Sequence, residues 1–326
     1  MKKIFIFLCS LFLGIGLFWL VFRQVGWGEV EKSFFFFEGW QGLIVLALTF
    51  LITAVNTIKW RTILKGLGGP LSFKKALSSY LSAFSIRYFM PIMVGAPELF
   101  QAQNINQKTG IPFKKSLASV IIDRILEATI FIIFIIFSLL LFFLKIGITL
   151  NPFFLFFFFL LLLLVFSLAF FYLKSFKGES FLKPLLKVFN SRINEKPYEV
   201  EQEILFFLKL KNKTFWRVVF LNLFRVAVVW LRAFLLVGFL GKGFLFFPSL
   251  IIFSFYFCVS IFPIPAGLGS QDAAHAFIFS LLGIGAGTGT AFVMIIRASE
   301  LVFAIIGLLL FFHYGALFLK RRVLDK

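Results

Sequence analysis

The sequence predicts an all-α fold: a polytopic bundle of transmembrane helices that includes two broken, re-entrant helix pairs in an inverted repeat. Hydrophobic residues make up 61% of the 326 residues, whereas an ordinary soluble domain is roughly 45–50% apolar. The run from Phe153 to Leu173 has no charge over 21 residues, and about 20 apolar residues are enough to cross a membrane. Two further apolar regions are interrupted by proline and glycine in the same pattern.

Six apolar segments are predicted to cross the membrane: 4–22, 40–58, 116–144, 152–173, 215–240 and 288–313. Basic residues lie beside alternate ends of these segments, at Lys2 and Lys3, Lys59, Arg61 and Lys65, and Lys320, Arg321 and Arg322. By the positive-inside rule, this places both termini in the cytoplasm and makes 174–213 a cytoplasmic loop. Residues 1–326 are expected to form a single integral domain of the cell (cytoplasmic) membrane.

Two apolar but broken regions, 76–105 and 245–284, remain between these spans. The segments LSFKKALSS (71–79) and IPFKKSLAS (111–119) flank the first region, and both are typical of basic segments at a membrane surface. If both lie on the cytoplasmic face, the chain between them enters and leaves on that side, which predicts a re-entrant hairpin. The same alternation predicts that 245–284 is re-entrant from outside. Alternatively, each region forms two short crossing helices, which leaves the position of the termini unchanged.

The two broken regions share a sequence pattern. Pro-x3-Gly-x2-acid occurs at Pro91, Gly95 and Glu98 and again 174 residues later at Pro265, Gly269 and Asp272. The pattern Arg-x2-Glu likewise occurs at Arg124 and Glu127 and recurs at Arg297 and Glu300. Because the two regions are predicted to enter from opposite sides, the recurrence indicates an inverted-topology repeat.

The second turn, PIPAGLGSQD, contains Pro263, Pro265, Gly267 and Gly269. Broken helices at membrane depth are tolerated where they are buried in protein or line a wet cavity. We therefore expect the tip of each re-entrant pair to face a polar cavity. Glu98 and Asp272 fall in the first turn of a half-helix, where the helix dipole stabilises a carboxylate, so a capping role explains them equally well.

Seven charged residues fall inside the predicted spans: Asp123, Arg124, Glu127, Arg225, Arg232, Arg297 and Glu300. Each costs about 2.5–3.5 kcal/mol at the bilayer centre, so none is expected to face lipid unpaired. Arg124 with Glu127, and Arg297 with Glu300, are spaced for pairing one turn apart. Arg225 has no acid within a turn, and neither has Arg232, so their partners are expected on other helices or on a ligand. Two interpretations of these charges are therefore possible: they line a substrate cavity, or they form purely structural ion pairs.

Several other functions are disfavoured. The net charge of +19 is explained by orientation and contact with anionic lipid rather than by nucleic acid. His275 and His313 lack ligands at metal-site spacing, and no Gly-rich phosphate loop with Lys-Ser/Thr is present. We expect no metal, no cofactor and no catalytic residues.

The segments NTIKWRTILKGLG (56–68), FMPIMVGAPE (89–98), ASVIIDRILE (118–127), PIPAGLGSQDAA (263–274) and RASELVFAIIGLLL (297–310) occur in this order. Together they resemble the landmarks of the lysylphosphatidylglycerol synthase transmembrane-region family, also called flippase-like membrane proteins, over about residues 40 to 315. The resemblance implies broken transmembrane helices and the movement of phospholipids or lipid-linked headgroups between leaflets.

Three positions depart from the family pattern. Asp272 stands where the family more often has Glu, Ala266 where glycine is common, and Gln101 where the family often has Arg. Loss of an Arg removes a bidentate contact to phosphate. The family's synthases carry an additional soluble aminoacyltransferase domain that this sequence does not contain, so we do not expect synthase activity.

The leading hypothesis is a lipid flippase-like transporter, with membrane lipids, anionic or lipid-linked, as its ligands. Its four candidate arginines would attract phosphate, and Asp123, Glu127 and Glu300 would balance charge or couple to protons. The first alternative is a secondary transporter of a soluble anion. The second is a non-transporting membrane-protein partner of a cell-envelope or glycolipid enzyme.

Overall fold

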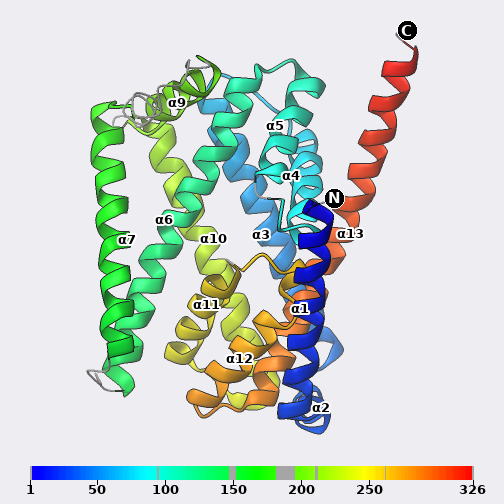
Figure 1. Cartoon of the computed structure of the whole chain (residues 1–326), viewed down its shortest axis with the longest axis vertical. Coiled ribbons are helices and arrows are strands. Elements are labelled where there is room, and N and C mark those ends of the chain that lie inside the picture. The colour runs from blue at the N-terminus through cyan, green and yellow to red at the C-terminus, as the bar shows by residue number, and fades with distance from the viewer. Residues whose placement is uncertain are drawn as a thin grey trace. The chain divides into compact units, whose positions relative to one another are not determined.

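The computed structural model describes residues 2–93, 95–146, 152–180, 195–209, 212–260 and 262–324. Every regular element in these ranges is a helix, which confirms the all-α prediction (Figure 1). Three described stretches are long and apolar enough to cross a membrane: Gly39–Gly66, Lys213–Lys242 and Ala286–His313. A fourth results if Leu11–Val25 and Trp27–Phe34, which meet at a bend of 83°, count as one span.

The chain divides into two compact units. Unit 1 comprises Met1–Ala54, Leu77–Phe100 and Val226–Lys326, and unit 2 comprises Val55–Ala76 and Gln101–Arg225. Four helices contribute residues to both units: α3 (Gly39–Gly66), α4 (Phe73–Phe89), α5 (Ala96–Thr109) and α10 (Lys213–Val237). Each unit is described separately below.

Unit 2 is organised around α6 (Phe113–Ile146), which packs against α7 (Pro152–Lys177) and α9 (Glu195–Phe207) (Figure 1). Buried apolar residues of α6 recur every four positions at Ala118, Ile122 and Leu126, which places them on one face of the helix. That face packs with apolar residues that follow or lie in α3, α9 and α10, among them Ile63, Leu67, Phe207, Leu208, Phe215 and Val218.

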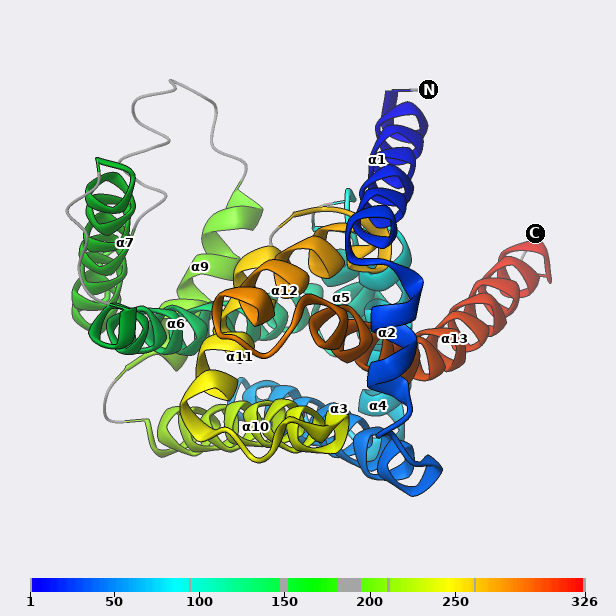
Figure 2. The same ribbon diagram turned by 90° about the horizontal axis from the view of Figure 1, so that it is seen from below.

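Unit 1 is organised around the short helix α12 (Ser270–Leu281). It packs against α1 (Lys2–Val25), α11 (Phe246–Ser260) and α13 (Ala286–Leu324), as Figure 2 shows from below. Helix α2 (Trp27–Phe34) packs against α13. Glycines allow α13 to approach its neighbours closely, because a Cβ at Gly289 would lie 2.3 Å from the backbone oxygen of His275. Small residues serve the same purpose at membrane helix interfaces generally.

Helices cover all six predicted spans. Helices α1, α6 and α7 match 4–22, 116–144 and 152–173 closely. Helix α10 and the first part of the turn η1 (Gly238–Lys242), whose backbone leaves the helical conformation at Leu240, together cover 215–240. However, α3 ends at Gly66 rather than at residue 58, and α13 ends at Leu324 rather than at 313. The backbone hydrogen bonds of a helix do not depend on hydropathy, so a helix continues beyond the apolar window that reveals it. Which helices cross the membrane stays a prediction.

Both predicted helix breaks are present in unit 1. Helices α4 and α5 are separated at residues 90–95, and α11 and α12 are separated by the turn that contains η2 (Pro265–Gly267). Pro91 and Gly95 lie in the first break, and Pro263 and Gly269 lie in the second. Re-entrance and the inverted repeat stay predictions. Residues 181–194 of the predicted loop 174–213 lie outside the described residues.

Candidate functional site

The seven candidate charges fall into separate groups within the two units. In unit 2, Asp123, Arg124, Glu127 and Arg225 join Lys59, and these five residues are called the Lys59 cluster below. In unit 1, Arg232 and Glu300 form one pair and Arg297 and Asp272 another.

The Lys59 cluster is assembled from α3 and α6 by a buried ion pair. Lys59 Nζ lies 3.0 Å from Asp123 Oδ1, and neither side chain is more than 1% exposed. On the same helix as Asp123, Arg124 reaches both neighbouring acids: its Nη2 lies 3.1 Å from Asp123 Oδ2 and its Nη1 2.5 Å from Glu127 Oε2. The expected Arg124–Glu127 pair thus forms, but within a larger network.

Helix α10 completes this cluster through Arg225, whose Nη1 lies 3.0 Å from Glu127 Oε1. The partner of Arg225 is therefore on another helix, one of the two arrangements that the sequence left open. Asn222, one turn earlier, accepts hydrogen bonds from Arg225 Nε at 3.1 Å and Lys59 Nζ at 3.4 Å. Its amide also donates to the Leu126 carbonyl at 2.7 Å, so a single buried side chain connects three helices.

The formal charges of the Lys59 cluster do not cancel. Three cations and two carboxylates sum to +1. The most accessible member is Arg124, whose side chain is 27% exposed, while Arg225 is 4% exposed and Lys59 is fully buried. Ion pairs removed from water persist only when geometry and further hydrogen bonds offset the desolvation cost. The network supplies both, with Arg124 at its accessible edge.

In unit 1, Arg232 of α10 pairs with Glu300 of α13, with Nη2 3.0 Å from Oε1. Arg232 Nη1 also donates to Thr49 Oγ1 at 3.0 Å. The hydroxyl of Tyr256 lies 3.0 Å from Glu300 Oε2, to which it donates. The sequence suggested Arg297 as the neighbour of Glu300 on α13. Each of these two residues instead takes a partner from another segment, because the packing around α13 brings oppositely charged groups from α10 and α12.

Arg297 binds the turn that precedes α12. Its Nη2 lies 2.5 Å from Asp272 Oδ2, and its Nε donates to the Ala266 carbonyl at 3.2 Å. Asp272 is fully buried and accepts a hydrogen bond from the backbone of Gly269 at 2.9 Å. It thus caps the first turn of α12. In the first break, Arg87 likewise lies 2.9 Å from Glu98, so an arginine neutralises the acid at both breaks.

The backbone of the second turn adopts conformations that favour glycine. Gly267 and Gly269 have φ values of 61° and 75°, and Ala266, which is not glycine, has a φ of 52°. A Cβ at Gly269 would lie 2.3 Å from the backbone oxygen of Gly14, so the turn also approaches α1 too closely for a side chain. Glycine, which has no Cβ, would adopt this left-handed conformation at position 266 without strain.

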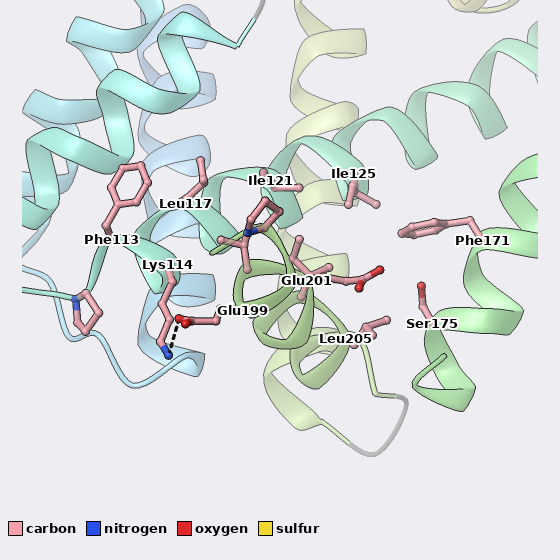
Figure 3. A pocket seen from close by; sticks show the side chains of 14 residues that line it. Phe113, Lys114, Leu117, Ile121, Ile125, Phe171, Ser175, Glu199, Glu201 and Leu205 are labelled. Carbon is pink, nitrogen blue, oxygen red and sulfur yellow. Dashed lines mark ion pairs between the residues drawn. The ribbon is translucent and has the colours of Figure 1, made fainter. Parts of the chain in front are cut away.

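An apolar pocket of about 930 Å³ lies among α6, α7 and α9 of unit 2 (Figure 3). Leu117, Ile121 and Ile125 line it from α6, and Lys114 pairs with Glu199 at 3.1 Å beside it. At 3.6 residues per turn, Asp123 projects about 160° away from Ile121. The pocket therefore lies on a different face of α6 from the buried Lys59–Asp123 pair, and it is not the predicted polar cavity.

The family model for the lysylphosphatidylglycerol synthase TM region matches residues 7–307 of this chain. The chain belongs to this family. Among curated proteins, the UPF0104 membrane protein MJ1595 of Methanocaldococcus jannaschii is 27% identical over 95 residues. That match spans 29% of this chain and 28% of the archaeal protein's length. No solved structure matches.

Family membership accounts for the landmark segments but leaves several site residues without a sequence signal. Lys59 directly follows the apolar segment 40–58, so its position predicts a flanking positive charge and not a buried one. Tyr256 and Thr49 lie in apolar helices and carry no charge that would mark them. Asn222 is recognisable in principle, because it precedes Arg225 by one helical turn and a lone amide is unusual in an apolar segment.

Proposed function

We propose that this protein translocates a phospholipid or a lipid-linked polar headgroup between the leaflets of the membrane. The observation that carries the proposal is the pairing of Arg232 with Glu300. Both belong to helices long and apolar enough to cross a membrane, and Glu300 lies fourteen residues after Ala286 and thirteen before His313. A charged pair is therefore held near the middle of a membrane-length helix.

A charged pair held within apolar membrane-length helices suits a ligand that is polar at one end and apolar elsewhere. Ionisable groups within membrane helices mark substrate and ion pathways, because placing a charge inside the bilayer is otherwise costly in free energy. Arginine binds phosphate with two parallel hydrogen bonds. Exposed apolar residues such as Leu223 and Phe224, beside Arg225 on α10, would leave the acyl chains in the bilayer while the headgroup meets the charges.

The test is lipid movement in proteoliposomes with headgroup-labelled phospholipids and a membrane-impermeant reductant. The wild-type protein should expose inner-leaflet label to the reductant faster than empty liposomes do. Arg232→Gln, which removes the cation from the Arg232–Glu300 pair, should slow this movement by about tenfold or more, the effect of truncating one partner of a buried charge pair. Lys32→Gln is the matched control, because Lys32 forms an exposed pair with Glu29.

Three other results would change or replace the proposal, provided that the variants elute and unfold like the wild type. Movement unaffected by Arg232→Gln would remove the Arg232–Glu300 pair from the mechanism. Uptake of a labelled anion without lipid movement would replace the proposal with a soluble-anion transporter. Neither movement nor uptake, together with a co-purifying envelope enzyme, would replace it with a non-transporting partner.

A further inference from the structure

The apolar pocket among α6, α7 and α9 is lined by residues of unit 2 alone. Its volume of about 930 Å³ falls within the roughly 300–1,000 Å³ that is typical of small-molecule sites. Leu117, Ile121 and Phe171 line it and are only partly buried, so they present apolar surface to the cavity. A hydrocarbon ligand would cover this surface, which the hydrophobic effect favours.

One hydroxyl in this apolar lining has no hydrogen-bond partner among the described residues. Ser175 is fully buried, and its Oγ bonds to none of them. Helical serines often donate to the carbonyl one turn earlier, as Ser82 does to Ser78 at 2.9 Å and Ser254 to Leu250 at 3.1 Å. A buried polar group without a partner is costly, so the hydroxyl of Ser175 is available to a ligand.

A buried carboxylate shares this side of the pocket. Glu201 is 7% exposed, and its Oε2 accepts a hydrogen bond from Ser180 at 2.5 Å. Figure 3 shows the carboxylate of Glu201 and the hydroxyl of Ser175 both pointing into the space between α9 and α7. A carboxylate has about four lone-pair sites, so it can accept further hydrogen bonds. At the other end of the pocket, Lys114 and Glu199 neutralise each other (Figure 3).

These two polar groups distinguish ligands by what the ligand donates and accepts. An ionised carboxylate only accepts, whereas a serine hydroxyl both donates and accepts. An alcohol can donate to Glu201 and accept from Ser175 at the same time. An ester has no proton to donate to Glu201, and an ammonium group cannot accept from Ser175. The pair therefore favours a neutral hydroxyl group over either.

The position of the pocket along the helices suits the head of a membrane lipid. Phe113, the first residue of α6, lines it, as does Ser175 near the end of α7. Lys174 and Lys177 lie in the last turn of α7, and such basic ends are predicted to lie at the cytoplasmic surface. A lipid alcohol places its hydroxyl at this depth and its chain in the hydrocarbon.

We propose that the pocket among α6, α7 and α9 binds a neutral lipid alcohol, with Ser175 donating to the hydroxyl oxygen of the ligand and Glu201 accepting its proton in a hydrogen bond. The hydrocarbon chain lies against Leu117, Ile121 and Phe171. The site requires no movement of lipid between leaflets, so this inference does not depend on the proposed function.

The experiment offers the detergent-solubilised protein an equimolar mixture of oleyl alcohol, methyl oleate and oleylamine at neutral pH. These probes share an unsaturated chain and differ in their heads, and mass spectrometry after gel filtration measures which are retained. The alcohol should exceed the ester by about tenfold, because the ester loses a hydrogen bond to a charged group. It should exceed the amine by about fivefold, the effect of one neutral hydrogen bond. Equal retention, or a preference for the ester or the amine, would overturn the proposal.

Two variants should each remove one of these preferences. Ser175→Ala removes the donor, so the alcohol should lose its advantage over the amine and keep that over the ester. Glu201→Met removes the acceptor and should do the reverse, whereas loss of a merely structural contact would change the retention of all three probes together. Glu201→Gln, with a weaker neutral acceptor, should reduce the advantage over the ester if Glu201→Met does not fold. Folded variants that shift neither ratio would overturn the proposal.

A control and a blocking variant locate the site. Ser82→Ala removes a fully buried helical hydroxyl from unit 1 and should change neither ratio. Ile121→Trp fills the pocket and should reduce retention of every probe, whereas Ile133→Trp, at an exposed position of the same helix, should not. Retention unaffected by Ile121→Trp would place binding elsewhere and overturn the proposal.

The outcomes also separate this inference from the proposed function. If the alcohol is preferred and the variants behave as expected but no lipid moves in proteoliposomes, the proposed function fails and this inference stands. Lipid movement without any preference for the alcohol would overturn this inference and leave the proposed function standing.

Discussion

Arg297 and Asp272 hold together the turn between α11 and α12, with Nη2 of the arginine 2.5 Å from Oδ2 of the aspartate. The aspartate is fully buried, and the same guanidinium binds the carbonyl of Ala266 on the other side of the turn. One side chain from α13 therefore fixes both the strained backbone and the cap of α12. This arrangement gives Arg297 a structural task in addition to the headgroup contact expected from sequence.

Replacing Arg297 should therefore destabilise unit 1. Arg297→Met leaves the buried carboxylate of Asp272 without its cation, at a cost of about 3–5 kcal/mol. Adding Asp272→Asn should recover most of this loss, because the amide oxygen still accepts from Gly269. Thermal unfolding in detergent measures both effects, with Lys32→Met at an exposed pair as the control. An unchanged unfolding temperature for Arg297→Met would contradict the structural role.

Ala266→Gly should stabilise the protein. Ala266 has a φ of 52°, and a left-handed conformation costs a residue with a Cβ about 1–2 kcal/mol. Glycine removes that strain, although its greater freedom in the unfolded chain offsets part of the gain. Ala274→Gly within α12 is the matched control and should cost about 0.5–1 kcal/mol. Equal shifts in unfolding temperature for the two variants would show that the turn stores no strain.

The helices and the two breaks were predictable because hydropathy and proline-glycine patterns act locally. The charged partners were not. Spacing along one helix suggested that Arg297 would face Glu300, yet the ion pairs join each residue to another segment. Such choices depend on which helices pack together, and the spacing of charges along one helix does not show that.

Lys59 illustrates a second limit of the sequence. By the positive-inside rule, a lysine at the end of an apolar run is interpreted as a charge that flanks a membrane span. In the structure α3 continues for seven more residues, and the side chain of Lys59 is completely buried. Its neighbour Trp60 is also fully buried and donates to Ser119 at 3.0 Å. Composition marked the end of the hydrophobic window, whereas packing against α6 determined the environment of the charge.

Tyr256→Phe should weaken the Arg232–Glu300 pair without changing the packing of the ring. The hydroxyl of Tyr256 donates to Glu300 at 3.0 Å, and a hydrogen bond to a charged group contributes about 1.5–3 kcal/mol. The expected result is a lower unfolding temperature. Tyr88→Phe is the comparison, because its hydroxyl donates to the Arg297 carbonyl at 3.3 Å, a longer bond to a neutral acceptor. A larger loss for Tyr88→Phe would contradict the role of the carboxylate.

Gly307→Ala should destabilise unit 1, whereas Gly16→Ala should not. A Cβ at Gly307 would lie 2.1 Å from the backbone oxygen of Leu81, so α13 and α4 must separate, and overpacking typically costs about 1–3 kcal/mol. A Cβ at Gly16 meets nothing within 4 Å, and alanine stabilises a helix interior by about 0.5–1 kcal/mol relative to glycine. Both changes add one methyl group to a helix, so helix propensity alone predicts a gain in stability at each position. Opposite shifts in unfolding temperature would therefore isolate the close approach of α13 to α4, and a gain at both positions would exclude it.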